Sequence, residues 1–297
     1  MKNVLSKCNL CPRNCEVNRY EKVGVCGAGH RIKIAHFSLH EWEEPVISGD
    51  NGSGTIFFSH CNLKCIFCQN KRISTLGYGK EITGKRFREI CLELQDKGAH
   101  NINLVTPTHY VPQIVNEIKK LKNKELTIPI VYNTSSYENV STIEMLDGLV
   151  DIYLADFKYF DNDLGVKYSH CNNYFEVTCK AVDAMYKQVG PCIIDNNLMK
   201  SGLIVRVLIL PGHADDAIKV IEYLYNTYGD NIWISIMNQF TPCNLIFEYD
   251  NLNREITDDE YNMVIHYACD LGVTNAFIQT GNTASESFIP KFNCENI

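Results

Sequence analysis

The chain has 297 residues, of which 45% are hydrophobic and 10% aromatic, so it can form a sizeable core. Its formal charge of −7 makes a nucleic acid an unlikely partner, because nucleic-acid-binding domains usually carry a basic surface. No apolar run approaches the roughly 18 residues of a membrane span, and the start has no apolar signal region. We therefore expect a cytoplasmic protein without a membrane segment. Its 14 cysteines indicate metal ligands or reduced thiols rather than disulfides.

Four of these cysteines lie near the N terminus in the spacing CxxCxxxCx₁₀C: Cys8, Cys11, Cys15 and Cys26. Four thiolates suit either zinc or an Fe-S cluster, and the spacing does not separate the two. The segment is rich in turn residues and has little core of its own, so we expect a knuckle that depends on its metal to fold. The sequence is compatible with two roles for this site: a structural metal, or an auxiliary cluster that relays electrons.

From residue 53 onward, short apolar runs alternate with helical patterns, which is typical of βαβ units with a parallel sheet. Strands are predicted at 55–59, 101–105, 128–132, 150–155, 203–210 and 232–237. Helices are predicted at 84–96, 111–121, 140–147, 174–188 and 214–225. A helix at 258–271 and a strand at 275–278 are expected to cover the sheet edge, and 190–202 is expected to be an exposed loop.

Three further cysteines, Cys61, Cys65 and Cys68, follow the first predicted strand in the spacing CxxxCxxC. Three thiolates in one loop can hold three corners of a cubic iron-sulfur cluster and leave the fourth iron open. The loop begins where a strand ends, and barrel enzymes keep their chemistry at such ends. Zinc with a fourth ligand such as His60 is the alternative.

This loop, with Phe67 before its last cysteine, resembles the signature of the radical S-adenosylmethionine (SAM) superfamily. The resemblance is closest to proteins related to pyruvate formate-lyase activating enzyme and covers nearly the whole chain. The matching stretches are CNLCPRNC (8–15), WEEP (42–45), CNLKCIFCQN (61–70), NINLVTPTH (101–109), DFKY (156–159) and MNQF (237–240). It implies an α/β fold with a partial (β/α)₆ barrel over 51–245, preceded by the Cys-rich knuckle in 1–50 and followed by a C-terminal extension over 246–297.

The resemblance also implies the cofactors. A [4Fe-4S] cluster on Cys61, Cys65 and Cys68 would bind the amino and carboxylate groups of SAM. Reductive cleavage of SAM would then give methionine and a 5′-deoxyadenosyl radical, which takes hydrogen from the substrate. A flavodoxin- or ferredoxin-type electron donor is expected, and Phe67 should pack near the adenine.

Polar residues at the next two strand ends are candidate SAM contacts. Thr106 and Thr108 stand where glycyl-radical activases have Gly-Gly-Glu-Pro, and they supply no carboxylate. Capping the following helix is their alternative role. Asn133 and Ser135 offer amide and hydroxyl groups that suit ribose or carboxylate, although a plain turn would use the same residues.

Charged and polar residues also end the later strands. Alternation should turn Asp156 and Lys158 toward the same face. By the resemblance, Asp156 holds ribose or substrate and Lys158 approaches the SAM carboxylate; a structural salt bridge is the alternative. Arg206 either binds the SAM carboxylate or pairs within the core. Gln239 either faces the barrel mouth or is a hydrogen-bonded core residue.

Three functions are compatible with these patterns. The first is a radical SAM enzyme that takes hydrogen from a glycine of a partner glycyl-radical enzyme. The second keeps this cofactor chemistry but acts on another peptide, an amino acid or a small metabolite, and the missing Gly-Gly-Glu-Pro carboxylate favours it. The third is a non-catalytic electron carrier or zinc-stabilised interaction module, which has no need of polar groups at successive strand ends.

Overall fold

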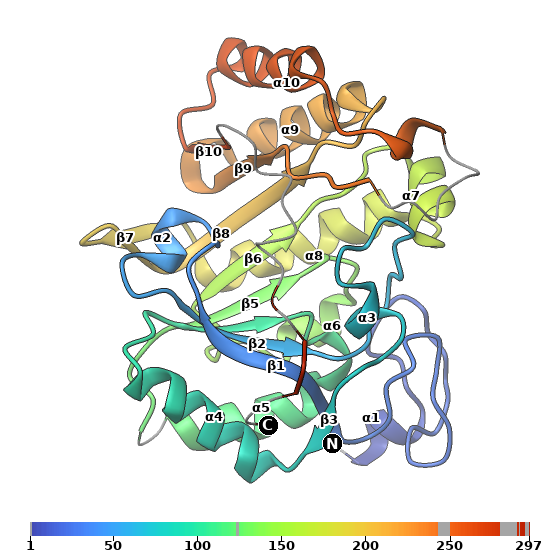
Figure 1. The fold of residues 1–297 in the computed structure, drawn as a ribbon, viewed down its shortest axis with the longest axis vertical. Coiled ribbons are helices and arrows are strands. Elements are labelled where there is room, and N and C mark those ends of the chain that lie inside the picture. The colour runs from blue at the N-terminus through green and yellow to red at the C-terminus, as the bar shows by residue number, and fades with distance from the viewer. Residues whose placement is uncertain (1, 123–124, 243–249, 280–289, 291, 295–296) are drawn as a thin grey trace.

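The computed structural model describes residues 2–122, 125–242, 250–279, 290, 292–294 and 297. Its centre is a ten-stranded sheet in the order β10-β9-β8-β6-β5-β4-β2-β1-β3, with β7 paired to β8 (Figure 1). The strands are β1 Ile32–His40, β2 Ser53–Phe58, β3 Lys80–Ile82, β4 Ile102–Val105, β5 Ile130–Thr134, β6 Ile152–Asp156, β7 Ile193–Asp195, β8 Leu198–Leu208, β9 Trp233–Met237 and β10 Ala276–Ile278.

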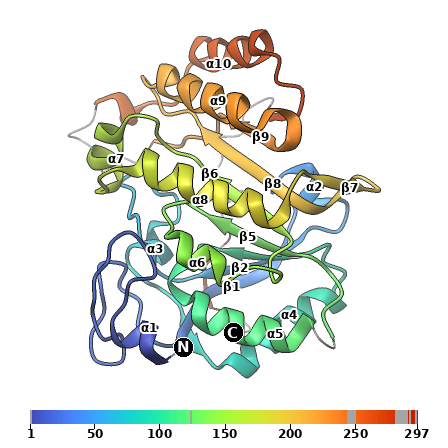
Figure 2. The same cartoon turned by 180° about the vertical axis from the view of Figure 1, so that it is seen from behind.

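The predicted α/β barrel architecture is confirmed. Strands β2, β4, β5, β6, β8, β9 and β10 run parallel, and they include all six predicted barrel strands. Parallel neighbours need long crossovers, and helices supply most of them. Figure 2 shows α5, α6, α8 and α9 covering one face of the sheet. The helices are α1 Lys2–Ser6, α2 Pro45–Ser48, α3 Lys71–Ser74, α4 Gly84–Asp96, α5 Val111–Lys122, α6 Val140–Glu144, α7 Asn162–Ser169, α8 Tyr174–Val189, α9 Ala214–Tyr228 and α10 Asp258–Leu271.

Local chemistry explains where the best-predicted helices begin. The Thr83 side chain accepts a hydrogen bond from the backbone N–H of Arg86 at the start of α4. Thr257 and Glu260 form a reciprocal capping box at the start of α10. Such caps satisfy backbone N–H groups that have no partner within the helix, so both boundaries agree with the sequence pattern.

Several elements differ from the sequence predictions, among them helix α7 and strand β3, which were not predicted. Strand β1, from the N-terminal segment, was not predicted; it pairs antiparallel with both β2 and β3 and so joins the barrel sheet. The predicted loop at 190–202 is wrong, because β7 and β8 form a hairpin there. Its turn residues Asn196 and Asn197 have φ values of 50° and 62°, which asparagine tolerates and a two-residue hairpin turn requires. Helix α6 ends at Glu144, earlier than predicted.

The central strands of the sheet are buried on both faces. All residues of β2 and β5 are buried, as expected for parallel strands covered on each side. On the inner face, Ile47 of α2 packs with Val131, Leu154 and Ile204. These apolar side chains fill part of the barrel interior, whereas polar residues occupy neighbouring inward positions of the same strands. The fold thereby leaves a polar space in the barrel.

The described C-terminal residues return to the first strands. The ring of Phe292 lies 5.4 Å from that of Phe57 on β2, and Lys80 of β3 donates to the carbonyl of Cys294 at 3.1 Å. Within the described ranges, no helix has the length and apolar character needed to cross a bilayer.

Candidate active site

A cavity of about 460 Å³ lies where the parallel strands end. Each of the six predicted barrel strands contributes lining residues from its carboxyl end. Those at the strand ends are Phe57, Phe58, Val105, Thr106, Asn133, Thr134, Ser135, Asp156, Lys158, Arg206, Leu208, Ser235, Met237, Gln239 and Phe240. This is the position at which open α/β sheets and barrels bind ligands.

Cys61, Cys65 and Cys68 line the same cavity. They lie in the loop that follows β2, and this loop turns sharply because His60 and Lys64 have φ values of 78° and 63°. Non-glycine residues seldom adopt this conformation, so the surrounding packing must hold it. The fold thus places the three cysteines along one cavity, and their joint role as cluster ligands stays a prediction.

Close packing against His60 supports this turn. A Cβ atom on Gly27 would lie 2.8 Å from Nδ1 of His60, so a larger residue there would displace the ring. Burial, together with the nearby charges of Lys33 and Lys64, lowers the pKa of His60 to about 4. The ring is therefore neutral near pH 7.

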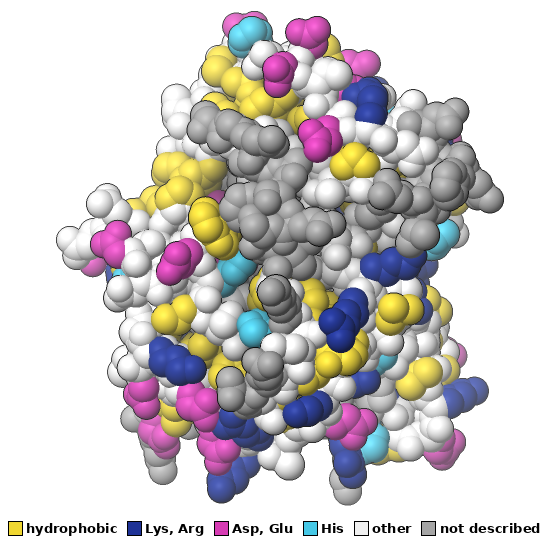
Figure 3. Space-filling model, in the orientation of Figure 1, with side chains coloured by type: hydrophobic (Ala, Val, Ile, Leu, Met, Phe, Trp, Pro, Cys, Tyr) yellow, Lys and Arg dark blue, Asp and Glu magenta, His cyan; other side chains and the backbone are white. Residues whose placement is uncertain are grey.

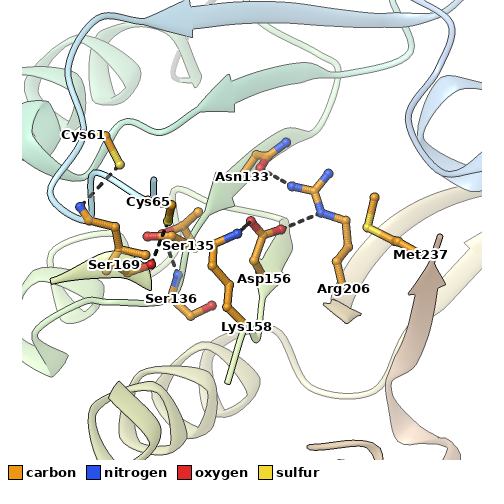
Figure 4. Close-up of polar contacts among 12 residues, drawn as sticks. Cys61, Cys65, Asn133, Ser135, Ser136, Asp156, Lys158, Ser169, Arg206 and Met237 are labelled. Carbon is orange, nitrogen blue, oxygen red and sulfur yellow. Dashed lines mark hydrogen bonds and ion pairs between the residues drawn. The ribbon is translucent and has the colours of Figure 1, made fainter. Parts of the chain in front are cut away.

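The sulfur atoms have polar neighbours that suit thiolate ligands (Figure 4). Hydrogen bonds to cluster sulfurs are among the features that set the potential of an Fe-S centre. The contacts are Leu63 N–H to Cys61 Sγ at 3.4 Å, Ser169 Oγ to Cys65 Sγ at 2.9 Å, and Ser74 Oγ with Cys68 Sγ at 3.2 Å.

Burial opposes thiolate formation at two of these cysteines. It raises the pKa of Cys65 to about 12, although the neighbouring charge of Lys158 acts in the opposite direction. Burial likewise raises the pKa of Cys68. Because metal ligation requires deprotonated sulfur, a bound cluster would have to supply the compensating positive charge.

The donor set fits a [4Fe-4S] cluster. Each thiolate of such a cluster binds a different iron, so three sulfurs that face one roomy cavity are sufficient. In the described part of the chain, no group of three or more His, Cys, Asp or Glu side chains is placed so that it could hold a metal ion. Cluster ligation by Cys61, Cys65 and Cys68 accordingly stays a prediction.

A network of partly buried charges crosses the cavity (Figure 4). Asp156 accepts from Lys158 Nζ at 2.7 Å and from Arg206 Nε at 2.8 Å. Arg206 also donates to Asn133 Oδ1 at 2.7 Å and forms an ion pair with Glu43 Oε2 at 3.2 Å. The salt bridge considered from the sequence is present, and its members also line the cavity.

Contacts within the network keep its acidic and basic side chains ionised. Burial raises the pKa of Asp156, but the charges and hydrogen bonds of Arg206 and Lys158 outweigh it and leave the pKa below its usual value. Burial lowers the pKa of Lys158, and Asp156 more than offsets this. Asp156, Lys158 and Arg206 are therefore charged near pH 7.

Most of the other predicted cofactor residues lie at the cavity. Phe67, Asn133, Ser135 and Gln239 line it. The ring of Phe67 is buried and lies 5.9 Å from that of Phe240. The Ser135 hydroxyl is buried and has no hydrogen-bond partner among the described residues.

The two threonines predicted to contact SAM, Thr106 and Thr108, lie in different surroundings. Thr106 lines the cavity and has a φ of 58°. Thr108 does not line it, because its hydroxyl is buried and donates to Glu138 at 2.6 Å. Neither side chain caps the helix that follows; Pro107 precedes a 3₁₀ turn at Thr108–Tyr110, and α5 begins at Val111. A direct SAM contact by Thr108 is therefore not supported by this arrangement.

Glu43 and Glu44 were not predicted as site residues, although both line the cavity. They follow β1, which was itself not predicted, so the sequence did not reveal which strands they approach. Glu43 accepts from Asn103 at 3.0 Å in addition to its contact with Arg206. The only sequence signal was their place in the matching stretch at 42–45.

The N-terminal cysteines surround a second, much smaller cavity of about 10 Å³. Cys8, Cys11, Cys15 and Cys26 all line it. Gly24 is required there, because a Cβ atom would lie 2.9 Å from Cys15 Sγ. Burial raises the pKa of Cys11 to about 12 and also raises that of Cys26. The four cysteines line one small cavity, and their role as ligands of one metal stays a prediction.

Comparisons with known proteins agree with the fold and the cysteine loop. Residues 55–224 match the family model described as the radical SAM superfamily. An uncharacterized protein of Methanocaldococcus jannaschii is 32% identical over 281 residues, which cover 90% of this chain and 75% of that protein.

Solved structures with the same fold are more distant. A radical SAM methyltransferase from Sphaerobacter thermophilus has a TM-score of 0.53 at 15% identity. The match covers 76% of this chain and 66% of the methyltransferase chain. Streptococcus suis SuiB, bound to the precursor peptide SuiA, has a TM-score of 0.51 at 15% identity. The match covers 74% of this chain and 46% of SuiB. This chain thus spans less than half of SuiB, and at such identity the likeness concerns the fold.

Replacing Lys158 by methionine tests whether this residue binds SAM. The change removes the ammonium but keeps apolar volume, and Asp156 retains Arg206 as a partner. We expect a folded protein whose affinity for SAM falls by roughly 1–3 kcal/mol, as for a lost hydrogen bond to a charged group. Equilibrium dialysis with labelled SAM measures it.

Lys122→Met is the matched control, because Lys122 pairs with Asp151 at 2.7 Å away from the lining of the cavity. It should leave SAM binding unchanged. Unaltered SAM binding in a folded Lys158→Met protein would return Lys158 to a structural role.

Proposed function

Because the chain belongs to the radical SAM superfamily, we propose that it is an enzyme that takes a hydrogen atom from a substrate held in the cavity of about 460 Å³. The observation that carries this proposal is that Cys61, Cys65 and Cys68 face the same cavity as the charged network of Asp156, Lys158 and Arg206. A [4Fe-4S] cluster held by these cysteines would supply the electron that cleaves the C5′–S bond of SAM to methionine and a 5′-deoxyadenosyl radical, the species that would abstract hydrogen.

The chain's own residues bind and orient these groups. Cys61, Cys65 and Cys68 would each hold one iron and leave the fourth for SAM. Lys158 is our candidate to contact the SAM carboxylate, because it lines the same cavity as the three cysteines. Phe67 offers an apolar surface for the adenine.

Glu44 indicates the class of substrate. Its side chain is only 7% exposed, lines the cavity, and has one oxygen, Oε2, without a hydrogen-bond partner among the described residues. Within that part of the chain the two cations of the network make ion pairs within 4.0 Å with Asp156 and Glu43 but not with Glu44, although the charge of Arg206 acts on Glu44 and the Ser235 side chain hydrogen-bonds to it.

A buried carboxylate without a paired cation costs several kcal/mol, unless it takes up a proton or a ligand supplies the charge. Burial raises the pKa of Glu44, although Arg206 acts against this. We therefore propose that the substrate is an amino acid, or the amine of a peptide, whose ammonium group pairs with Glu44.

Activation of a glycyl-radical enzyme is the second candidate. The Asp-x-Lys at Asp156 and Lys158, which lines the cavity, resembles that of the activases. Against it, the loop after β4 brings Thr106 rather than a carboxylate to the cavity.

The N-terminal knuckle is proposed to hold a single zinc ion with a structural role. Its cavity of about 10 Å³ has room for about one water-sized sphere, which suits one ion better than a four-iron cube. Zinc bound by four thiolates is a common structural site.

A flavodoxin- or ferredoxin-type protein is the proposed electron donor. Lys71 and Arg72 are exposed on α3, just after Cys68. Figure 3 shows basic side chains gathered on this face of the molecule. Such a patch would attract a donor with an acidic surface to the edge of the cluster loop.

Changing Cys61, Cys65 and Cys68 together to alanine tests the central proposal. The variant should lose the EPR signal of a reduced [4Fe-4S] cluster and all formation of 5′-deoxyadenosine, because the irons lose their ligands. It should keep zinc in stoichiometric amount at the knuckle. Metal analysis and chromatography of the reaction products measure these outcomes.

Cys179→Ala is the control, since this half-buried thiol lies outside both cysteine cavities. It should behave as the unchanged protein. SAM cleavage by the triple variant would refute the cluster assignment, and a triple variant without zinc would refute the knuckle assignment.

Glu44→Gln tests the substrate class with n-butylamine and n-butanol as probes. In the cluster-loaded protein with SAM, butylamine should raise the melting temperature more than butanol does, because only the amine carries a charge. Glu44→Gln should abolish this difference, whereas Glu41→Gln, at an exposed residue of the same connection, should retain it.

Equal responses to the amine and the alcohol would contradict the proposed ammonium site. A fall in SAM affinity in Glu44→Gln would do so as well, because it would place the amino group of SAM itself at Glu44.

The second candidate is tested by anaerobic incubation with a purified glycyl-radical enzyme. Activation would produce the EPR doublet of a glycyl radical together with 5′-deoxyadenosine. If 5′-deoxyadenosine forms without the doublet, this partner is not the substrate.

A further inference from the structure

Arg13 connects the N-terminal knuckle to the loop of Cys61, Cys65 and Cys68. It lies between Cys11 and Cys15, and its side chain reaches across to backbone carbonyls on two other segments. The guanidinium donates to Asn62 O at 2.8 Å, to Leu63 O at 3.1 Å, to Ser169 O at 3.0 Å and to His170 O.

Two of the residues held in this way also contact cysteine sulfurs. Leu63 accepts from Arg13 through its carbonyl, and its own N–H donates to Cys61 Sγ at 3.4 Å. Ser169 accepts through its carbonyl, and its hydroxyl donates to Cys65 Sγ at 2.9 Å. Figure 4 shows Ser169 directed at Cys65.

This arrangement of acceptors suits an arginine side chain better than a lysine side chain. A guanidinium is planar, keeps its charge, and presents five N–H donors in a fixed fork, whereas a lysine ammonium is a compact charge on a flexible stem. One side chain can therefore fix the cluster loop relative to the residues that end α7. Arg13 also lies over the ring of Tyr137, 5.5 Å from its centre, which limits its movement.

We infer that Arg13 is a positioning residue for the iron-sulfur site: by holding the carbonyls of Leu63 and Ser169, it sets the hydrogen bonds that Cys61 and Cys65 receive. This inference rests on the proposed ligand role of these cysteines. Hydrogen bonds to the sulfurs favour the reduced, more negative cluster, so the contacts that aim them influence its potential. The knuckle then acts on the active site through one side chain.

The test uses the full-length, anaerobically reconstituted protein with the substitutions Arg13→Lys and Arg13→Gln. Both should keep their iron and fold while the reduction potential of the cluster shifts to more negative values and the EPR g-values of the reduced state change. Thr142→Val is the matched control, because it removes another bond between barrel and knuckle, Thr142 Oγ1 to Leu10 O at 2.7 Å, without touching the cluster loop. It should change neither quantity.

Unchanged potential and g-values in folded Arg13 variants would overturn the inference. So would an equal shift in Thr142→Val, since the effect would then come from loosened docking in general. If the Arg13 variants do not fold, Ser169→Ala decides: it removes the donor to Cys65 together with the 2.7 Å contact between the Ser169 and Tyr159 hydroxyls, which Tyr159→Phe removes alone as the control. A cluster with unaltered potential in Ser169→Ala would count against the inference, whereas a negative shift that is absent from Tyr159→Phe supports it.

Failure of the proposed function gives a different result. In that case the unchanged protein itself would show no EPR signal that disappears when Cys61, Cys65 and Cys68 are replaced by alanine.

Discussion

The carboxylate of Asp156 accepts hydrogen bonds from Lys158 and Arg206 at once, and the site is organised around this contact. Buried ions require partners, so each of these side chains restrains the others. Arg206 extends the restraint to Asn133 on β5 and to Glu43 after β1. Four segments of the barrel are thereby locked together at the depth where a ligand would lie. A polar cavity in a folded core is stable only because its charges are paired in this way.

The cysteine loop has the opposite character. Its thiols lie in an environment whose burial disfavours thiolates, as the raised pKa of Cys65 shows. Its hydroxyl and N–H neighbours nevertheless suit anionic sulfur. This combination fits a site completed by positively charged iron, in which the protein supplies geometry and hydrogen bonds.

The knuckle is closely joined to the barrel by polar contacts. Thr142 and Asn139 on the barrel side donate to the carbonyls of Leu10 and Asn9, each at 2.7 Å, in addition to the bonds made by Arg13. A segment with little core of its own is thus held by hydrogen bonds to a rigid neighbour. These contacts join the knuckle to the barrel beside the cluster loop, which Arg13 contacts through Asn62 and Leu63.

Patterns between residues close in sequence determined much of this protein. Apolar runs and caps located the barrel strands and most of its helices, and cysteine spacing located both thiol groups, because these features depend on neighbouring residues. Strand ends also located Asp156, Lys158 and Arg206, since parallel strands bring their carboxyl ends together.

Only the tertiary structure decided the contacts that complete the site. Arg206 and Glu43 are 163 residues apart, and Arg13 and Asn62 are 49 apart. Strand β1 pairs with β2 and carries Glu43 and Glu44 into the cavity, whereas Thr108 turns away to Glu138. Which side chains meet across such distances depends on strand order and packing. Neither can be read from the spacing of residues along the sequence.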